Sequence, residues 1–71
     1  MAFSHRRIVG QNIRNYRRQA RLSQERLAEK AALSYKYLGE IERGQENISL
    51  DALARIADAL KVPLTDLVRD V

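Results

Sequence analysis

Three charged side chains recur at steps of three and four residues in the segment LSYKYLGEIERG. They are Lys36, Glu40 and Arg43, and on a helix this spacing places them together on one side. Lysine and arginine donate hydrogen bonds to guanine O6 and N7 or to phosphate, and glutamate can accept one from cytosine N4. Leu38 and Ile41 fall on the opposite side. The segment therefore predicts a helix with one apolar face for a scaffold and one hydrogen-bonding face for a ligand.

Residue types that build catalytic or metal sites are scarce. His5 is the single histidine and the chain has no cysteine, so neither a Cys/His metal cluster nor a disulfide is expected. No glycine-rich phosphate loop follows a strand, and no serine lies in a nucleophile elbow. We therefore expect a protein that is not an enzyme and that uses no cofactor, metal ion or small-molecule ligand.

The basic residues are concentrated in the first half of the chain. Residues 1–36 contain nine Lys/Arg and two Asp/Glu, a net charge of +7, whereas residues 37–71 contain four and seven, a net charge of −3. This asymmetry suggests a basic face for nucleic acid or an anionic membrane, or else a lopsided solvated surface. The basic residues do not form one helix with a large apolar face, and no apolar run approaches the roughly 18 residues of a membrane span. We therefore expect a cytoplasmic protein without a membrane partner.

A chain of 71 residues allows one domain with a small core. Apolar residues at helical spacing predict five helices and no strand. The expected ranges are 8–20, 24–31, 35–43, 50–60 and 63–69. The expected N-caps are Ser23, Ser34 and Ser49, and Gly44 is suited to a left-handed C′ position. Leu50 is placed on the apolar face of its helix. We expect a flexible basic arm over residues 1–7 and one domain over residues 8–71.

The stretch LSQERLAEKAALSYKYLGEIERGQENISLDALARIADAL resembles the Cro/CI-type (lambda-repressor-like, XRE) helix-turn-helix family. The spacing of two short helices, the IERG end and the SLDAL cap carry the resemblance, which covers about residues 8–68. The matching residues are Leu22, Gln24, Leu27, Ala28, Leu33, Ser34, Tyr37, Leu38, Ile41, Glu42, Arg43, Gly44, Ser49, Leu53, Ala57 and Leu60. Among small members, the chain is similar to controller proteins of restriction–modification systems. The resemblance implies an all-α, five-helix lambda-repressor-like DNA-binding domain whose helix 35–43 lies in the major groove.

The resemblance also implies which residues contact double-stranded DNA. Gln24 corresponds to a glutamine that contacts the DNA backbone, although it can simply begin its helix. Tyr35 and Lys36 occupy positions that read bases. The residues assigned to DNA contact are Arg17, Gln24, Ser34, Tyr35, Lys36, Tyr37, Gly39, Glu40, Arg43 and Asn47.

Several of these residues have a second interpretation. Ser34 fits a helix cap better than a DNA contact, and Tyr37 can touch DNA or pack against the first helix. Arg43 and Asn47 correspond to positions that meet phosphates or the minor groove, and Asn47 can instead bond its own loop backbone. Gly39 either admits another backbone or relieves crowding. Glu40 can accept from cytosine, but we favour pairing with Lys36 or Arg43 on the same face.

Two positions concern the scaffold of the resembling family. The family commonly pairs an arginine with a glutamate where this chain has Arg17 and Glu42, which predicts a partly buried ion pair; Arg17 can also donate to phosphate. The family often has glycine where this chain has Ala32. A left-handed alanine there would cost roughly 1 kcal/mol, unless the turn adopts a conformation that alanine tolerates.

The C-terminal segment is rich in apolar residues. We assign Val62, Leu64, Leu67, Val68 and Val71 to a homodimer interface, although Leu64 and Leu67 can instead close the core. Members of the resembling family usually dimerise, and two-fold symmetry requires a palindromic operator. The predicted function is a sequence-specific double-stranded DNA-binding transcriptional regulator, and its likeness to small members suggests a restriction–modification controller protein. The alternative is a protein-interaction module such as an antitoxin subunit or an adaptor.

Overall fold

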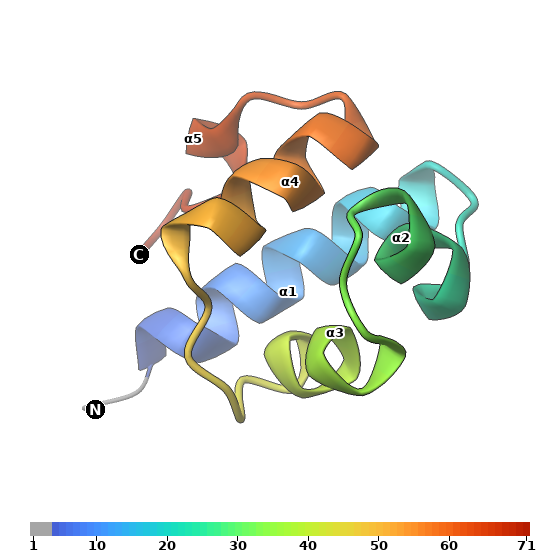
Figure 1. The fold of residues 1–71 in the computed structure, drawn as a ribbon. Coiled ribbons are helices and arrows are strands. Elements are labelled where there is room, and N and C mark those ends of the chain that lie inside the picture. Colours follow the sequence, from blue (N-terminus) through green and yellow to red (C-terminus); the bar gives the residue numbers. More distant parts are fainter. Residues whose placement is uncertain (1–3) are drawn as a thin grey trace.

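Five helices form the part of the chain that the structure, a computed structural model, describes, residues 4–71. They are α1 (Ser4–Gln19), α2 (Gln24–Lys30), α3 (Tyr35–Glu42), α4 (Leu50–Leu60) and α5 (Leu64–Leu67). In Figure 1, α1 spans the molecule, α4 and α5 cover one side of it and α3 the other, and α2 lies at the far end. Residues 4–71 contain no strand, so the predicted all-α, five-helix class is confirmed. None of these helices is long and apolar enough to cross a membrane.

Serine side chains begin three of the helices, as predicted. Ser23, Ser34 and Ser49 each accept a hydrogen bond on Oγ from the backbone N–H three residues further on, at 3.0 or 3.1 Å. Such a cap satisfies one of the N–H groups that a helix start leaves unpaired, and is worth about 1 kcal/mol. The starts of α2, α3 and α4 are therefore local properties of the sequence.

Helices α1 to α4 all end in the same left-handed turn. Arg21, Ala32, Gly44 and Lys61 have φ angles of 59°, 57°, 73° and 59°. Each donates its N–H to the carbonyl three residues back, and the next residue donates to the carbonyl five residues back, as in a Schellman motif. The predicted left-handed Gly44 is confirmed, and Ala32 is left-handed as well. Three of these four turns therefore place a side chain where glycine is favoured.

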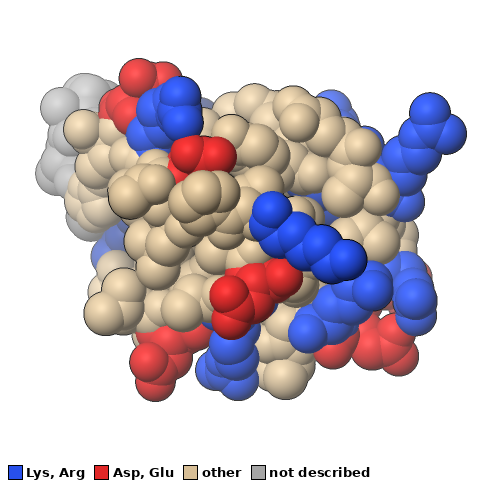
Figure 2. All heavy atoms as spheres, turned by 90° about the horizontal axis from the view of Figure 1, so that it is seen from above, with Lys and Arg blue, Asp and Glu red and all other residues tan. Residues whose placement is uncertain are grey.

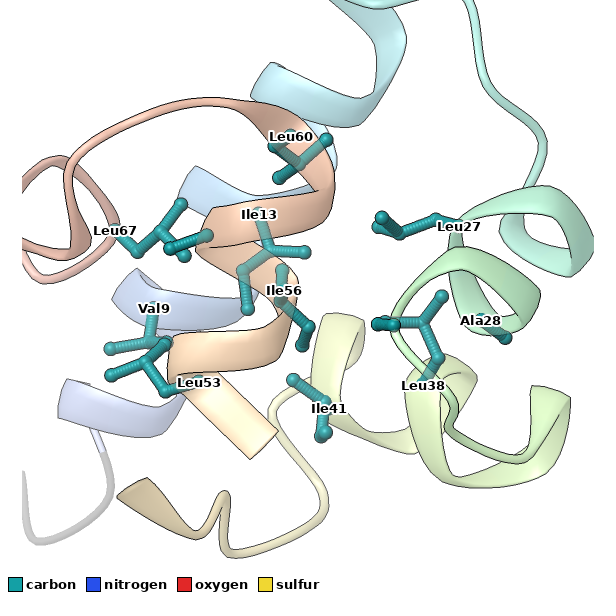
Figure 3. Packing of buried hydrophobic residues seen from close by; sticks show 12 residues of the cluster. Val9, Ile13, Leu27, Ala28, Leu38, Ile41, Leu53, Ile56, Leu60 and Leu67 are labelled. Carbon is teal, nitrogen blue, oxygen red and sulfur yellow. The ribbon is translucent and has the colours of Figure 1, made fainter. Parts of the chain in front are cut away.

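The core lies between α1, α3 and α4 and receives side chains from all five helices (Figure 3). Its fully buried side chains are Ile13, Leu27, Leu38, Ile41, Ile56 and Leu67. Gly10 lets α1 cross the last turn of α3 closely, because a Cβ on residue 10 would lie 2.8 Å from the carbonyl oxygen of Glu42. The crossing fixes α3 against α1 through backbone contact. A larger side chain at position 10 would separate the two helices.

The start of α1 differs from the prediction. The helix begins at Ser4, four residues before the expected Ile8, so residues 4–7 of the predicted arm are helical; residues 1–3 lie outside the described residues. The first turn is held by tertiary packing, since a Cβ on Gly44 would lie 3.1 Å from the Cα of Arg7. No apolar residue in 4–7 signals this contact, which is why the pattern of apolar residues placed the start too late.

Other differences concern α4 and α5. The sequence predicts Leu50 on the apolar face of α4, but this first residue of the helix is 72% exposed. Helix α5 is four residues long rather than seven, and Pro63 is its N-cap, with an extended backbone, rather than part of its first turn. Helices α2 and α3 each end one residue earlier than predicted, at Lys30 and Glu42.

Candidate nucleic-acid interface

Helices α2 and α3, joined by residues 31–34, form a helix-turn-helix. The inner side of α3 is held by Leu38 and Ile41, which are buried against the core. Tyr35, Lys36 and Arg43 are exposed on the other side. The predicted division of this helix into a scaffold face and a hydrogen-bonding face is therefore present in the structure.

A shallow hollow of about 250 Å³ lies on the outer side of α3. It is lined by Gln24, Tyr35, Lys36, Gly39 and Arg43. All five belong to the set that the sequence assigned to DNA contact, so folding brings half of that set to one place. Cationic and amide donors around an open hollow suit hydrogen bonding to base edges and phosphates.

Gly39 makes room for a side chain of its own helix. A Cβ on residue 39 would lie 3.2 Å from Nη1 of Arg43, a closer approach than most real Cβ contacts. Arg43 follows the last residue of α3, and its Nε donates to Oε1 of Gln45 at 3.0 Å. The guanidinium therefore lies close to Gly39 at the edge of the hollow, and a larger residue at position 39 would displace it by a few tenths of an ångström.

Glu42 is the centre of a buried polar network that joins the first three helices. Its carboxylate accepts hydrogen bonds from Nε of Arg17 at 2.7 Å and from Nη2 of Arg17 at 3.1 Å. The side chain of Glu42 is 2% exposed and that of Arg17 is 11% exposed. The third guanidinium nitrogen, Nη1, donates to the carbonyl of Leu22 at 2.8 Å. Because every nitrogen of Arg17 is engaged inside the chain, the geometry favours its bracing role over a phosphate contact.

Gln24 takes part in the same network, which sequence reasoning missed. Its Nε2 donates to Oε1 of Glu42 at 2.9 Å, and its side chain also lines the hollow. An amide nitrogen has two N–H donors and the amide oxygen accepts, so further hydrogen-bonding capacity remains. The carboxylate thus orients Gln24 at the start of α2, where free backbone N–H groups favour an anion.

Tyr37 joins α3 to the loop that follows it. Its hydroxyl donates to the carbonyl of Asn47 at 3.1 Å and accepts from the backbone N–H of Ser49 at 3.3 Å. Asn47 itself is exposed, and its N–H donates to the carboxylate of Glu46 at 2.8 Å. The tyrosine hydroxyl therefore holds the loop between α3 and α4. Its partners lie ten and twelve residues away in sequence, so no local pattern predicted this role.

The predicted pairing of Glu40 is wrong. Within residues 4–71, Glu40 forms no ion pair with Lys36 or Arg43; the ion pairs there include those of Arg17 with Glu42, Arg26 with Glu29 and Arg69 with Asp66. Arg43 instead donates from Nε to Gln45, with its Nη1 lying next to Gly39. Glu40 remains half-buried beside the hollow and keeps its capacity to accept from a base.

The apolar residues of the C-terminal segment divide into two groups. Leu67 is completely buried in the core, so its assignment to a dimer interface is wrong. Val62, Leu64 and Val68 are half-buried against the core, whereas Val71 is 65% exposed. Figure 2, viewed from the side of α4 and α5, shows a broad area of uncharged residues among interspersed acidic and basic side chains.

Comparison of the chain with known proteins identifies its family. The helix-turn-helix family HTH_3 matches residues 13–67, which include the complete α2–turn–α3 unit. The chain belongs to the HTH_3 helix-turn-helix family. Proteins of this family are DNA-binding transcriptional regulators and are not enzymes.

Individual relatives of this HTH_3 chain include repressors and controller proteins. It is 45% identical over 60 residues to an immunity repressor of Bacillus phage phi105, covering 84% of this chain but 42% of the repressor. It resembles the crystal structure of the restriction-modification controller protein C.AhdI from Aeromonas hydrophila, with a TM-score of 0.89 and 37% identity over 92% of this chain and 98% of that one. SinR, a master regulator for biofilm formation solved in complex with DNA, matches with a TM-score of 0.80 and 37% identity over 83% and 95% of the two chains.

Proposed function

We propose that this HTH_3 chain is a sequence-specific transcriptional regulator that binds a palindromic operator as a homodimer. The hollow on α3 carries the proposal, because it gathers Gln24, Lys36 and Arg43 beside a helix whose inner side is buried. Helix α3 enters the major groove, whose donor and acceptor pattern distinguishes all four base pairs. The chain acts as a controller of the kind represented by C.AhdI, with which it shares its fold over 92% of its residues.

Within the hollow, the side chains divide by what they reach. Lys36 and Tyr35 are exposed on the first turn of α3, where lysine donates to guanine O6 or N7 and the tyrosine ring packs on a thymine methyl. Gln24 at the start of α2 and Arg43 at the end of α3 flank them and bind phosphates. Asn47, held in its loop through Tyr37, contacts the neighbouring phosphate. Phosphate contacts thus set the register and Lys36 and Tyr35 read sequence.

Dimerisation follows from the small size of one reading surface. A helix of eight residues covers few base pairs, and two copies about a two-fold axis double that reach. Val71 is 65% exposed, and Val62, Leu64 and Val68 are only partly buried against the core. Pairing these residues across the axis removes apolar surface from water. The dimer surface is therefore formed by Val62, Leu64, Val68 and Val71, without Leu67.

Selection of bound duplexes from a random pool tests the proposal. We expect an enriched palindrome whose half-sites are centred about 10 base pairs apart, one turn of DNA. An enriched single half-site would refute the dimer but keep the regulator. Failure to enrich any sequence, with a folded protein, would refute sequence-specific binding and favour a protein-interaction module.

A further inference from the structure

The segment after α4 has few hydrogen bonds of its own. Helix α5 is four residues long, and its N-cap, Pro63, makes no side-chain capping bond. An isolated helix of this length is not stable, so its position must come from tertiary contacts. Leu67 supplies one such contact, because it is completely buried in the core. The turn that follows Leu67 needs a separate explanation.

Asn12, on α1, supplies the hydrogen bonds for that turn. Its Nδ2 donates to the carbonyl of Leu67 at 3.1 Å and to the carbonyl of Arg69 at 2.9 Å. An amide nitrogen has two N–H groups, so this side chain uses its whole donor capacity on two carbonyls of the turn. These partners are 55 and 57 residues away in sequence, and the contact exists only in the folded chain.

Other contacts around Asn12 act on side chains rather than on the backbone of the turn. One helical turn along α1, the hydroxyl of Tyr16 lies 3.4 Å from Oδ2 of Asp66, a long hydrogen bond. Asp66 also accepts from Nη2 of Arg69 at 2.7 Å, and this hydrogen bond raises the pKa of the exposed guanidinium. Arg69 is 65% exposed at its side chain, so screening by water leaves that pair weak.

The turn that Asn12 holds decides where the last apolar side chains lie. Val68 follows α5 with φ −108° and ψ 13°, and Asp70 has a left-handed φ of 71°. Between them the chain reverses, and the N–H of Val71 donates to the carbonyl of Val68 at 3.2 Å. Val68 is left half-buried and Val71 exposed on the outside of this turn. Two carbonyls fixed by one amide therefore set the relative positions of Val68 and Val71.

We propose that Asn12 is a positioning residue for self-association: its amide holds residues 67–71 so that Val68 and Val71 meet a second copy of this chain. The inference rests on the homodimer of the proposed function. Because the side chain of Leu67 is buried in the core and only its carbonyl is bound by Asn12, loss of the amide releases the turn without removing α5 from the domain.

The test compares Asn12→Asp with the control Asn15→Asp by sedimentation of the full chain at neutral pH. A carboxylate cannot donate to the two carbonyls, so we expect Asn12→Asp to raise the dimer dissociation constant by roughly tenfold or more. Asn15 lies on the same helix, is exposed, and accepts from Nε2 of Gln11 at 3.0 Å, which a carboxylate also does. The control therefore makes the same charge change and should leave the dimer unchanged.

Two further measurements separate positioning from general destabilisation. Asn12→Leu removes the donors without adding charge and should weaken the dimer to a similar extent if Asn12→Asp fails to fold. Methyl NMR should show Val68 and Val71 shifting in either variant while Val9 and Ile56 in the core keep their positions. Binding to a duplex with one half-site should keep its base preference.

The outcomes distinguish this inference from the proposal beneath it. A dimeric parent protein whose Asn12 variants dimerise equally well would overturn the role of Asn12 and leave the regulator intact. A parent protein that stays monomeric at high micromolar concentration would overturn the homodimer and this inference together. Loss of folding stability in both Asn12 variants, with the dimer constant of the folded fraction unchanged, would also overturn the inference.

Discussion

At the scale of single residues, the polar side chains near α3 divide by whether the fold already uses them. Arg17 and Glu42 satisfy each other in the interior, and the Tyr37 hydroxyl is taken by the following loop. Lys36 is exposed and borders the hollow without an ion-pair partner among residues 4–71. A side chain without an intramolecular ion pair is best suited to contact a base, because the new hydrogen bond then replaces only a bond to water.

This difference predicts distinct effects for two substitutions. Lys36→Ala should weaken binding to the selected site by about 1–3 kcal/mol and relax preference at one base pair in each half-site. Arg43→Ala should weaken all sequences more evenly, because its guanidinium lines the hollow and is proposed to bind phosphate. Dissociation constants on the selected site and on each single-base variant are the measurement. Uniform losses for both variants would show that Lys36 is not the base reader.

At the scale of secondary-structure elements, the helix ends carry a cost that the helix starts do not. The serine caps satisfy N–H groups without strain, whereas Arg21, Ala32 and Lys61 hold left-handed backbones that favour glycine. The cost at Ala32 lies in the turn between α2 and α3, where a tight reversal fixes the angle of the reading helix. The turn is retained because both flanking helices are anchored, by Leu27 and Leu38 in particular.

Ala32→Gly should therefore stabilise the protein by about 1 kcal/mol, because glycine adopts a positive φ without the clash of a Cβ. The matched control is Ala54→Gly in the interior of α4, where the same change should destabilise by about 1 kcal/mol. Denaturant unfolding of both variants measures the two free energies. Destabilisation by both substitutions would mean that the turn at Ala32 is not left-handed in solution.

At the scale of the whole molecule, α1 connects α3, which carries the hollow, to the turn that follows α5. Gly10 and Arg17 fix it to α3, while Asn12 holds the turn after α5. In the proposed homodimer, one helix would therefore set the distance between the two copies of α3, through contacts on two of its sides. The net charge of +4, with the excess of basic residues in the first half of the chain, favours association with a polyanion.

The charge predicts a strong dependence of DNA affinity on salt. Each phosphate neutralised by a basic side chain should contribute about −0.9 to the slope of log K against log salt concentration. We expect Arg43→Ala to lower the magnitude of the slope by about one per half-site, and Arg55→Ala, on the exposed side of α4, to leave it unchanged. Dissociation constants measured across a salt series provide the slopes. A flat dependence for the parent protein would contradict electrostatic binding.

The sequence by itself determined the features that depend on residues within about five positions of one another. The three serine caps, the left-handed Gly44 and the two-faced character of α3 were all predicted. The reason is physical: a capping bond or a helical face is set by local spacing. The family resemblance rests on the same local signals.

Only the tertiary structure decided which side chains pair across the chain and which apolar residues stay exposed. Leu67 and Val71 look alike in sequence, yet the first is buried in the core and the second exposed, because the chain reverses between Val68 and Val71. Glu40 and Glu42 are likewise both glutamates on α3, and the approach of α1 at Gly10 brings Arg17 to Glu42 alone. Such choices depend on contacts between distant segments, and local periodicity carries no information about them.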